Sequence, residues 1–342
     1  MPVKNVAVLG GGSFGTVVAN IIAHNNHKTL LWMRDKEQVV SLNKSHENIN
    51  YLPGYKIHED VVATDDLEAA VKDVDLIFVA VPSSSFRNVV QQMQPLIHKD
   101  VILVSLTKGI EAKTFALMSQ ILAEETDNKQ IAVLSGPNLA KEIAVNSPTG
   151  AVVASIDPEV VKSVQEVLHS DNFRVYSNAD MLGVELGGSL KNIYAIIAGL
   201  AEAMGMGHNT NAMLVTRSLT EMARFGVELG ADPMTFLGLS GVGDLIVTCS
   251  SPLSRNFRVG NALGEGKDID LVISEMDQVA EGINTLKQVK DKADELGVKM
   301  PLVNGLYEIM YNNQTVDHII SSLMLEEQGL DVEFAAGRMQ TK

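Results

Sequence analysis

Short apolar runs alternate with helix-like stretches along the first half of the chain, and each run has the length of a β-strand. Two runs, Leu76 to Val81 and Val101 to Val104, are apolar without a break, as is typical of parallel strands covered on both faces. The alternation therefore predicts a mostly parallel, doubly wound sheet. The expected strands are Asn5 to Leu9, Lys28 to Met33, Asp75 to Val81, Val101 to Leu106, Ile131 to Ser135 and Thr149 to Ser155.

After Phe173 to Tyr176 the apolar positions recur with the period of an amphipathic helix, and glycine and proline mark the breaks between segments. This change predicts an α/β protein with an N-terminal Rossmann-type domain over residues 1–180 and an all-helical C-terminal domain over residues 181–342. The expected helices are Met181 to Met204, Asn209 to Leu229, Leu253 to Leu263, Glu281 to Leu296, Leu302 to Tyr311 and Val316 to Leu323.

A glycine-rich turn follows the first predicted strand and opens the first predicted helix. Gly10, Gly12 and Gly15 have the spacing G-x-G-x-x-G. In such a motif the first glycine permits a tight turn, the second lets a pyrophosphate approach the backbone, and the third packs the helix close to the strand. The helix N-terminus carries partial positive charge. The position of this motif between a strand and a helix favours a dinucleotide site over a chance glycine turn.

Composition and charge exclude several classes of function. The chain has 342 residues and a formal charge of −15, which disfavours binding to nucleic acid or to an anionic membrane surface. We expect a cytoplasmic protein without stable membrane insertion, because the sequence shows neither a signal-peptide pattern nor an apolar run of membrane-spanning length. Cys249 is the single cysteine, most simply a small buried apolar residue, and no histidine spacing is typical of a metal site, so no metal is expected.

Two lysines stand out because of the apolar segments around them. Lys108 lies between a predicted buried strand and Gly109, at the sheet edge where ligands bind; a solvated loop lysine is the alternative. Lys191 lies in an apolar predicted helix, shortly after Gly187 and Gly188. A buried charge needs a partner or a function, and two helical glycines indicate that a backbone or ligand comes close. A surface lysine is the alternative here.

A third cluster contains Asp244, which could pair with Lys191, and the run Ser254, Arg255 and Asn256. A forked cation with polar donors near a helix start suits a phosphate group. Taken singly, Asp244 or the nearby Ser251 could be a helix cap, and Arg255 could be part of a surface ion pair.

In their order along the chain, these segments resemble those of the bacterial-type NAD(P)-dependent glycerol-3-phosphate dehydrogenases. The matching segments are Gly10 to Gly15, Leu31-Trp32-x-Arg34, Thr107-Lys108-Gly109, Ser135-Gly136-Pro137-Asn138-x-Ala140, Lys191-Asn192, Gly243-Asp244 and Ser254-Arg255-Asn256. The resemblance covers essentially the whole chain. It implies hydride transfer with NAD(P)H that interconverts dihydroxyacetone phosphate and sn-glycerol 3-phosphate, and thereby supplies glycerol 3-phosphate for phospholipid synthesis.

The resemblance also implies roles for individual residues, with Lys191 as the proton acceptor in alcohol oxidation and the donor in ketone reduction. The implied substrate-binding residues are Lys108, Gly136, Asn138, Lys191, Asp244, Ser254, Arg255 and Asn256. The cofactor-binding residues are Gly10, Gly12, Ser13, Phe14, Gly15, Arg34, Lys108, Ala140, Arg255, Val279 and Glu281. Position 138 is Asn where many relatives carry Ser or Thr, a change that should preserve hydrogen bonding.

The end of the second predicted strand bears on the choice of cofactor. Arg34 stands where an acidic residue would select NAD(H), and arginine favours the 2′-phosphate of NADP(H). Asp35 follows directly and leaves the preference open, so we expect NADP(H) to be favoured and NAD(H) to be used as well. A homodimer formed through the helical domain is the expectation from the frequency of such dimers.

Two other functions compete with this interpretation. The first is a two-domain dehydrogenase of β-hydroxy acids or phosphosugar acids, in which an Asn often lies four residues after the catalytic Lys. Here position 195 is Ala and Asn192 is adjacent to Lys191, which disfavours that class. The second is a catalytically silent dinucleotide-binding sensor, which the presence of Lys191, Asp244 and Arg255 together disfavours.

Overall fold

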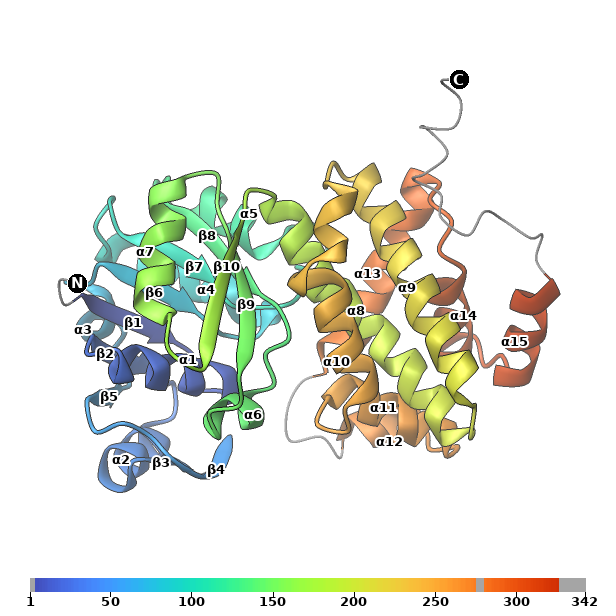
Figure 1. The fold of residues 1–342 in the computed structure, drawn as a ribbon, viewed down its shortest axis with the longest axis horizontal. Coiled ribbons are helices and arrows are strands. Elements are labelled where there is room, and N and C mark those ends of the chain that lie inside the picture. The colour runs from blue at the N-terminus through green and yellow to red at the C-terminus, as the bar shows by residue number, and fades with distance from the viewer. Residues whose placement is uncertain (1–3, 275–279, 326–342) are drawn as a thin grey trace. The chain divides into compact units, whose positions relative to one another are not determined.

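The computed structural model describes residues 4–274 and 280–325 of the chain (Figure 1). It divides into two compact units, Met1–Glu185 and Leu186–Lys342. The division falls inside helix α8 (Met181–Ala203), five residues beyond the end of the domain expected over residues 1–180.

The first unit is built on an eight-stranded sheet with the order β10-β9-β8-β7-β6-β1-β2-β5. Every neighbouring pair is parallel except β8 and β9. The mostly parallel sheet predicted from the apolar runs is thereby confirmed. The strands are β1 (Asn5–Leu9), β2 (Lys28–Trp32), β5 (Val61–Thr64), β6 (Leu76–Val79), β7 (Ile102–Ser105), β8 (Ile131–Ser135), β9 (Thr149–Ala154) and β10 (Phe173–Asn178).

Helices cover both faces of this sheet, so the sheet is doubly wound. Alternate side chains of β1 enter two separate cores: Val6 and Val8 pack into one, and Ala7 and Leu9 into the other. The first core also receives α1 (Ser13–His24), α2 (Lys36–Ser45), α6 (Ala140–Ala144) and α7 (Pro158–Leu168). The second receives α3 (Leu67–Val71), α4 (Ser83–Met93) and α5 (Met118–Glu125), with a short 3₁₀ turn, η1 (Gln94–Leu96), after α4.

Three strands of the first unit lie where the sequence indicated none, whereas β10 covers the Phe173 to Tyr176 segment that precedes the helical part of the chain. β5 is an edge strand in which Val61 and Ala63 are buried while Val62 is half exposed, and four residues are too few to give a clear alternating pattern. The other two, β3 (Glu47–Asn48) and β4 (Leu52–Lys56), form a small antiparallel pair outside the main sheet. Pro53 and Gly54 within β4 read as a turn rather than as a strand.

The second unit is helical throughout its described residues. Six of its helices were expected: α8, α9 (His208–Glu228), α11 (Arg255–Gly264), α13 (Glu281–Leu296), α14 (Pro301–Tyr311) and α15 (Val316–Leu325). Helices α8 and α11 lie in close contact, because a Cβ at Gly199 would lie 1.9 Å from the carbonyl oxygen of Phe257, and one at Gly260 would lie 1.8 Å from that of Ile196. Any larger residue at either position would force the two helices apart.

The segment between α9 and α11 is more regular than the sequence predicts. Its glycines and prolines indicate loop, yet the structure forms η2 (Pro233–Leu237), a π-helical turn η3 (Leu239–Gly243) and α10 (Asp244–Ser250). A further short helix, α12 (Ile269–Ser274), follows α11. A Cβ at Gly187 would lie 2.5 Å from the carbonyl oxygen of Ser240. The expected close approach of a backbone to the glycine pair in α8 is thus confirmed at Gly187.

Glu221 is a buried carboxyl group that joins three helices of the second unit. It is 3% exposed, and its oxygens accept hydrogen bonds from the backbone N–H groups of Leu302 (2.6 Å) and Val303 (3.4 Å) and from the Tyr194 hydroxyl (3.3 Å). It therefore satisfies donors in the first turn of α14 that have no partner within that helix. Burial raises the pKa of Glu221 to about 7.

The raised pKa of Glu221 predicts how stability depends on pH. The folded protein keeps this proton up to about pH 7, whereas the unfolded chain loses it near 4.5. Between these values the unfolded state binds fewer protons, so stability falls as pH rises. Glu221→Gln should flatten that slope, which thermal unfolding between pH 5 and 8 would measure. Some slope should persist, because burial also raises the pKa of Glu185 to about 7.

The exposed Glu228 on the same helix provides the control for this measurement. Glu228→Gln makes the same side-chain replacement without touching α14 and should keep the wild-type slope. Identical slopes for Glu221→Gln and the wild type would contradict the assignment.

Candidate functional site

The glycine turn after β1 is held by contacts that exclude a side chain at its first position. Gly10 has a φ of +119°, its N–H donates to the carbonyl oxygen of Trp32 at 3.0 Å, and a Cβ there would lie 2.6 Å from the carbonyl oxygen of Ala80. Only glycine adopts this conformation without strain. The turn is therefore tightly fitted between the ends of two strands.

Space opens at the second glycine, where helix α1 begins. A Cβ built at Gly12 would meet no atom within 4 Å, and Gly12 is the N-cap of α1 without a side chain to cap the helix. A Cβ at Gly15, by contrast, would lie 2.0 Å from the carbonyl oxygen of Gly10. The roles expected for the glycines thus fit the geometry: two are fixed by packing, and the third leaves the helix N-terminus open to an anion. These residues fit the pyrophosphate of a dinucleotide.

Hydrogen bonds with the segment of the small β3–β4 pair hold this turn in place, and the sequence did not predict them. The Asn48 side chain is 3% exposed, and its Nδ2 donates to the carbonyl oxygen of Gly11 and to Thr16 Oγ1, both at 2.8 Å. The Ser13 hydroxyl donates to the carbonyl oxygen of Tyr51 at 2.7 Å. Nothing in the sequence around Asn48 marks it, because its partners lie more than 30 residues away in the chain.

The residues after β2 bear on recognition of the adenosine ribose. Strand β2 is the neighbour of β1, with Trp32 opposite Leu9, so Arg34 follows the strand at the same sheet edge as the glycine turn. Arg34 is exposed. The Asp35 carboxylate is engaged as the cap of α2, where it accepts from the backbone N–H groups of Glu37 (2.9 Å) and Gln38 (3.2 Å). Asp35, which left the choice between NADP(H) and NAD(H) open in the sequence, therefore has a structural role as a helix cap.

Three of the predicted substrate residues gather at the carboxyl ends of β7 and β8, which are adjacent in the sheet. Lys108 Nζ donates to the carbonyl oxygen of Gly136 at 2.8 Å, and Gly136 has a φ of +127°. Both polar atoms of the Asn138 amide, and the Ser135 hydroxyl, are buried without a hydrogen-bond partner in the protein. A buried polar atom left unpaired costs about 1–3 kcal/mol, so this cluster suits a ligand that is rich in hydrogen-bonding groups.

In the second unit, Lys191 and Asp244 form a buried ion pair. The Lys191 side chain is 8% exposed and the Asp244 side chain 0%. Lys191 Nζ donates to Asp244 Oδ1 and, at 2.8 Å, to Thr248 Oγ1. The pairing expected from the sequence is confirmed, and the surface alternative for Lys191 is wrong.

Thr248 was missed by sequence reasoning, although a signal existed. It lies four residues after Asp244 and so shares a face of α10, but α10 itself was not predicted. Its hydroxyl also donates to the carbonyl oxygen of Asp244 at 2.5 Å. Cys249 is buried beside this group, and burial raises the pKa of its thiol to about 12, so it is an unreactive packing residue, as expected.

A chain of amide hydrogen bonds links Asn192, the residue after Lys191 on α8, to Asn256 on α11, and Asn256 to Gly282 on α13. Asn256 Nδ2 donates to Asn192 Oδ1 at 2.9 Å, and Asn256 Oδ1 accepts from the backbone N–H of Gly282 at 3.0 Å. This chain joins α8, α11 and α13. It fixes Asn192, the residue directly after Lys191, and places the first turn of α13 next to α11.

Of the remaining predicted residues, Phe14 in α1 and Ala140 at the start of α6 belong to the first unit, and Ser254, Arg255 and Glu281 lie at helix starts of the second. The Ser254 hydroxyl accepts from the backbone N–H of Phe257 at 3.3 Å and so caps α11, a role that the sequence had suggested for Ser251 or Asp244 instead. Arg255 is the first residue of α11 and Glu281 the first of α13, and both are half-buried. Val279, expected at the cofactor site, lies outside the described residues.

Within residues 4–274 and 280–325, no three His, Cys, Asp or Glu side chains gather as a metal site would require. In the same part of the chain, none of the helices combines the length and apolar character needed to cross a membrane.

Comparison with known families matches both units. The family model described as the NAD-dependent glycerol-3-phosphate dehydrogenase N-terminus matches residues 5–161, and the model of the C-terminus of the same enzyme matches residues 180–321.

Individual relatives match over nearly the whole chain. A glycerol-3-phosphate dehydrogenase [NAD(P)+] of Saccharophagus degradans is 56% identical over 97% of this chain and 93% of its own length. One of Pseudomonas aeruginosa is 56% identical over 96% of both chains. The crystal structure of glycerol-3-phosphate dehydrogenase from Coxiella burnetii aligns with a TM-score of 0.90 at 37% identity, and covers 95% of this chain and 99% of its own.

The open space at Gly12 gives a direct test of the dinucleotide site. Gly12→Ala adds a methyl group that meets no protein atom, so it should leave the melting temperature unchanged while it weakens dinucleotide binding by about tenfold or more, since the methyl would occupy the path of the pyrophosphate. Gly10→Ala is the contrasting variant and should be destabilised by more than 1 kcal/mol, about the cost of a strained φ. Titration of protein fluorescence with NADPH, beside thermal unfolding, would measure both effects. Unchanged affinity in Gly12→Ala would place the pyrophosphate elsewhere.

Proposed function

Because this chain belongs to the NAD-dependent glycerol-3-phosphate dehydrogenase family, we propose that it interconverts dihydroxyacetone phosphate and sn-glycerol 3-phosphate. The observation that carries the proposal is the buried Lys191–Asp244–Thr248 group, in a chain that also has an open glycine turn at a helix N-terminus. A binding protein without catalysis has no need of a desolvated lysine held by a carboxylate and a hydroxyl.

Gly10, Gly12, Gly15 and the N-terminus of α1 would hold the cofactor, with Ser13, Phe14 and Ala140 at the same sheet edge. When bound, the nicotinamide supplies the hydride for ketone reduction and accepts it in alcohol oxidation. Lys108, Arg255 and Glu281 complete the proposed cofactor contacts, and Lys108 and Arg255 serve the substrate as well.

Lys191 would carry the proton of the reaction. In ketone reduction a hydride adds to C2 of the substrate, and Nζ gives its proton to the carbonyl oxygen, which becomes the hydroxyl of the product. In alcohol oxidation the same nitrogen takes the hydroxyl proton as the hydride leaves C2. Asp244 and Thr248 accept hydrogen bonds from Lys191, and so hold its ammonium group in a fixed position.

The phosphate and hydroxyl groups of the substrate require fixed donors. Lys108 and the unpaired Asn138 amide supply these in the first unit, with Gly136 beside them as the carbonyl partner of Lys108. Ser254, Arg255 and Asn256 supply them at the start of α11 in the second. Local cations and a helix N-terminus are needed because the net charge of −15 repels an anionic substrate.

Replacing the lysine tests the proposed chemistry. Lys191→Met should lower turnover of dihydroxyacetone phosphate with NADPH by about 10²- to 10⁴-fold, which is the usual contribution of a general acid. The variant also leaves Asp244 buried without its cation, and loss of one partner of such a pair destabilises by about 3–5 kcal/mol. Lys191→Met combined with Asp244→Asn should therefore regain part of the melting temperature and none of the turnover.

Lys287→Met, which removes an exposed lysine from α13, is the control for loss of a charge. Initial rates of NADPH oxidation, with NADPH affinity as a second readout, separate catalysis from folding. Wild-type rates in a folded Lys191→Met variant would exclude Lys191 from the chemistry.

We further propose that NADP(H) is preferred and that NAD(H) is also used. Arg34 is exposed after β2, where its guanidinium can pair with a 2′-phosphate. Asp35, the residue that would favour the ribose of NAD(H), is held as the cap of α2.

Charge reversal at Arg34 tests this preference. Arg34→Glu should raise the KM for NADPH by about tenfold or more and change the KM for NADH much less, because only NADPH carries the 2′-phosphate. Lys36→Glu makes the same charge change on an exposed neighbour, whose ion pair with Asp65 spans 3.4 Å at the surface, and should affect both cofactors slightly and equally. Equal losses with NADPH and NADH in Arg34→Glu would contradict the assignment.

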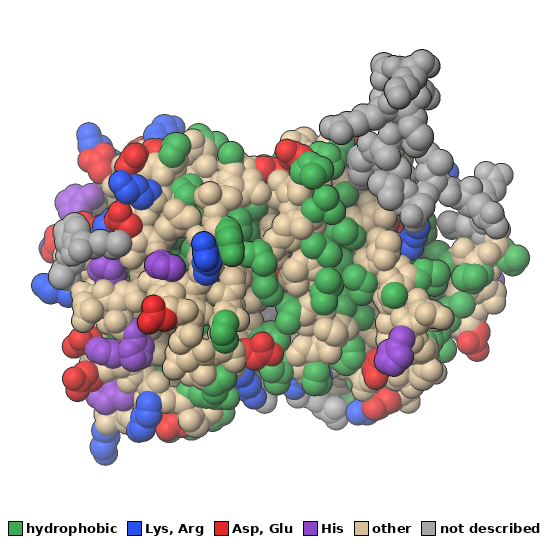
Figure 2. Space-filling view, viewed as in Figure 1, with side chains coloured by type: hydrophobic (Ala, Val, Ile, Leu, Met, Phe, Trp, Pro, Cys, Tyr) green, Lys and Arg blue, Asp and Glu red, His purple; other side chains and the backbone are tan. Residues whose placement is uncertain are grey.

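The cellular setting is also a proposal. We place the protein in the cytoplasm, supplying glycerol 3-phosphate for phospholipid synthesis, without a nucleic-acid partner. We propose a homodimer that forms through the helical unit. Exposed hydrophobic side chains of this unit include Met213, Met234, Leu237 and Ile246, and Figure 2 shows hydrophobic side chains gathered on one face of it. Such patches are typical of protein interfaces.

A further inference from the structure

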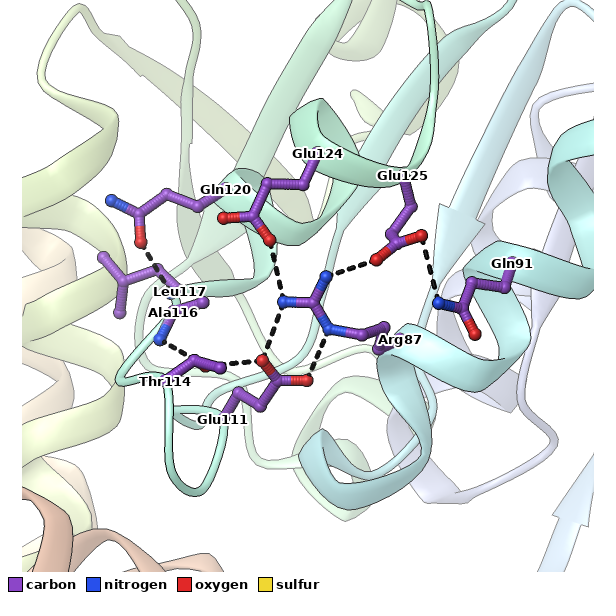
Figure 3. Close-up of polar contacts among 9 residues, drawn as sticks. All are labelled: Arg87, Gln91, Glu111, Thr114, Ala116, Leu117, Gln120, Glu124 and Glu125. Carbon is purple, nitrogen blue, oxygen red and sulfur yellow. Dashed lines mark hydrogen bonds and ion pairs between the residues drawn. The ribbon is translucent and has the colours of Figure 1, made fainter.

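A cluster of one arginine and three glutamates lies in the first unit, apart from the residues assigned above (Figure 3). Arg87 on α4 contacts Glu111 with two parallel hydrogen bonds of 2.7 Å, from Nε to Oε1 and from Nη2 to Oε2. Its Nη2 also contacts Glu124 at 2.8 Å, and its Nη1 contacts Glu125. The Arg87 side chain is 25% exposed and that of Glu111 is 18% exposed. A partly buried, two-pronged pair of this kind fixes geometry far better than an ordinary surface ion pair.

The three carboxylates come from two different parts of the chain. Glu124 and Glu125 end helix α5, whereas Glu111 lies in the loop between β7 and α5. Arg87 is on a rigid support, because Phe86, Val89 and Val90 beside it are buried in the core. Of the three carboxylates, Glu111 is therefore the one that joins the Arg87 guanidinium to a loop. The bonds to Arg87 also hold the pKa of Glu111 below its ordinary value.

The loop that carries Glu111 needs such an anchor. Two of its non-glycine residues, Lys113 and Phe115, have φ values of +76° and +61°, a left-handed conformation that costs about 1–3 kcal/mol unless the surroundings enforce it. The Thr114 hydroxyl donates to Glu111 Oε2 at 2.5 Å, and the backbone N–H of Glu111 donates to the carbonyl oxygen of Ala116 at 2.9 Å. Glu111 is thus the point at which the folded loop is attached to α4.

Lys108 lies three residues before Glu111 in the same loop. The stretch from Lys108 to Glu111 leaves β7 at the sheet edge, where the Thr107 hydroxyl donates to the carbonyl oxygen of Val81 at 2.7 Å. The backbone of Lys108 is thereby held by Thr107 on one side and, on the other, by a stretch in which Ile110 is buried and Glu111 is bonded to Arg87. From there its Nζ reaches the carbonyl oxygen of Gly136.

We propose that Arg87 and Glu111 are positioning residues, whose paired hydrogen bonds hold the loop after β7 so that Lys108 faces the substrate phosphate. The inference rests on the proposed function and adds to it residues that touch neither substrate nor cofactor. A displacement of about 1 Å in a ligand-positioning group can cost up to about 10²-fold in rate. Loss of the anchor therefore acts on substrate use and not only on stability.

The cluster contains its own matched control. Glu111→Gln and Glu124→Gln each remove one carboxylate charge from the same guanidinium. The first loosens the loop, whereas the second affects only the end of α5. We expect Glu111→Gln to lower kcat/KM for dihydroxyacetone phosphate by about tenfold to a hundredfold, mainly through a higher KM. Glu124→Gln should change kcat/KM less than about twofold, in line with the small contribution of a half-exposed ion pair.

A double-mutant cycle shows whether Glu111 acts through Lys108. Glu111→Gln is measured in the wild type and in a Lys108→Ala background, with melting temperatures recorded for every variant. If the effect is transmitted by Lys108, Glu111→Gln should cost little more once Lys108 is gone. Equal effects in both backgrounds, or equal losses in Glu111→Gln and Glu124→Gln, would overturn the proposal and leave the cluster as a stabilising contact.

Hydrogen exchange over residues 110–117 supplies a readout that does not depend on turnover. Glu111→Gln should speed exchange of these amides and Glu124→Gln should not; unchanged exchange in Glu111→Gln would overturn the anchoring. A wild-type protein that does not reduce dihydroxyacetone phosphate would instead refute the proposed function, and the exchange measurement would still decide whether Glu111 holds the loop.

Discussion

Lys191 and Asp244 bring opposite charges into a helical core where their side chains are 8% and 0% exposed. Removal of two charges from water is costly, and their attraction offsets the cost only when further hydrogen bonds satisfy the remaining donors and acceptors. Much of the surrounding structure meets that condition. Gly187 lets η3 pack against α8, α10 then presents Asp244 and Thr248 on one face, and the amide chain through Asn256 fixes the next residue of α8.

In the first unit, the constraint is that polar groups must be held in place at the edge of a buried sheet. Strands β8, β7, β6, β1 and β2 are parallel neighbours, so the loops that follow them meet at one edge. The glycine turn, the segment around Arg34, and Lys108 with Gly136 all follow these strands. Polar contacts from outside the sheet hold these loops, as Asn48 does for the glycine turn and Arg87 for the loop of Lys108.

The sequence predicts the features that depend on local pattern, and it misses those that depend on distant contacts. Apolar runs located most strands of the sheet, and helical periodicity located Glu281–Leu296 to the residue. The pairing of Lys191 with Asp244 followed from the cost of a buried charge. Thr248 was missed because the glycines before α10 indicated a loop and not a helix. Asn48 was missed because its hydrogen-bond partners come from another part of the chain. A helix cap was considered for Ser251 or Asp244, whereas the structure has Ser254 as the cap of α11.

The most direct test of the account is the initial rate of NADPH oxidation by the wild-type protein with dihydroxyacetone phosphate, measured beside a β-keto acid at the same concentration. A buried lysine held as a proton donor, together with cationic and amide groups suited to phosphate, predicts rapid NADPH consumption with the ketone phosphate and only background consumption with the keto acid. Tight NADPH binding without turnover of dihydroxyacetone phosphate would contradict the account, and turnover of the keto acid in its place would assign the same lysine to a different dehydrogenase.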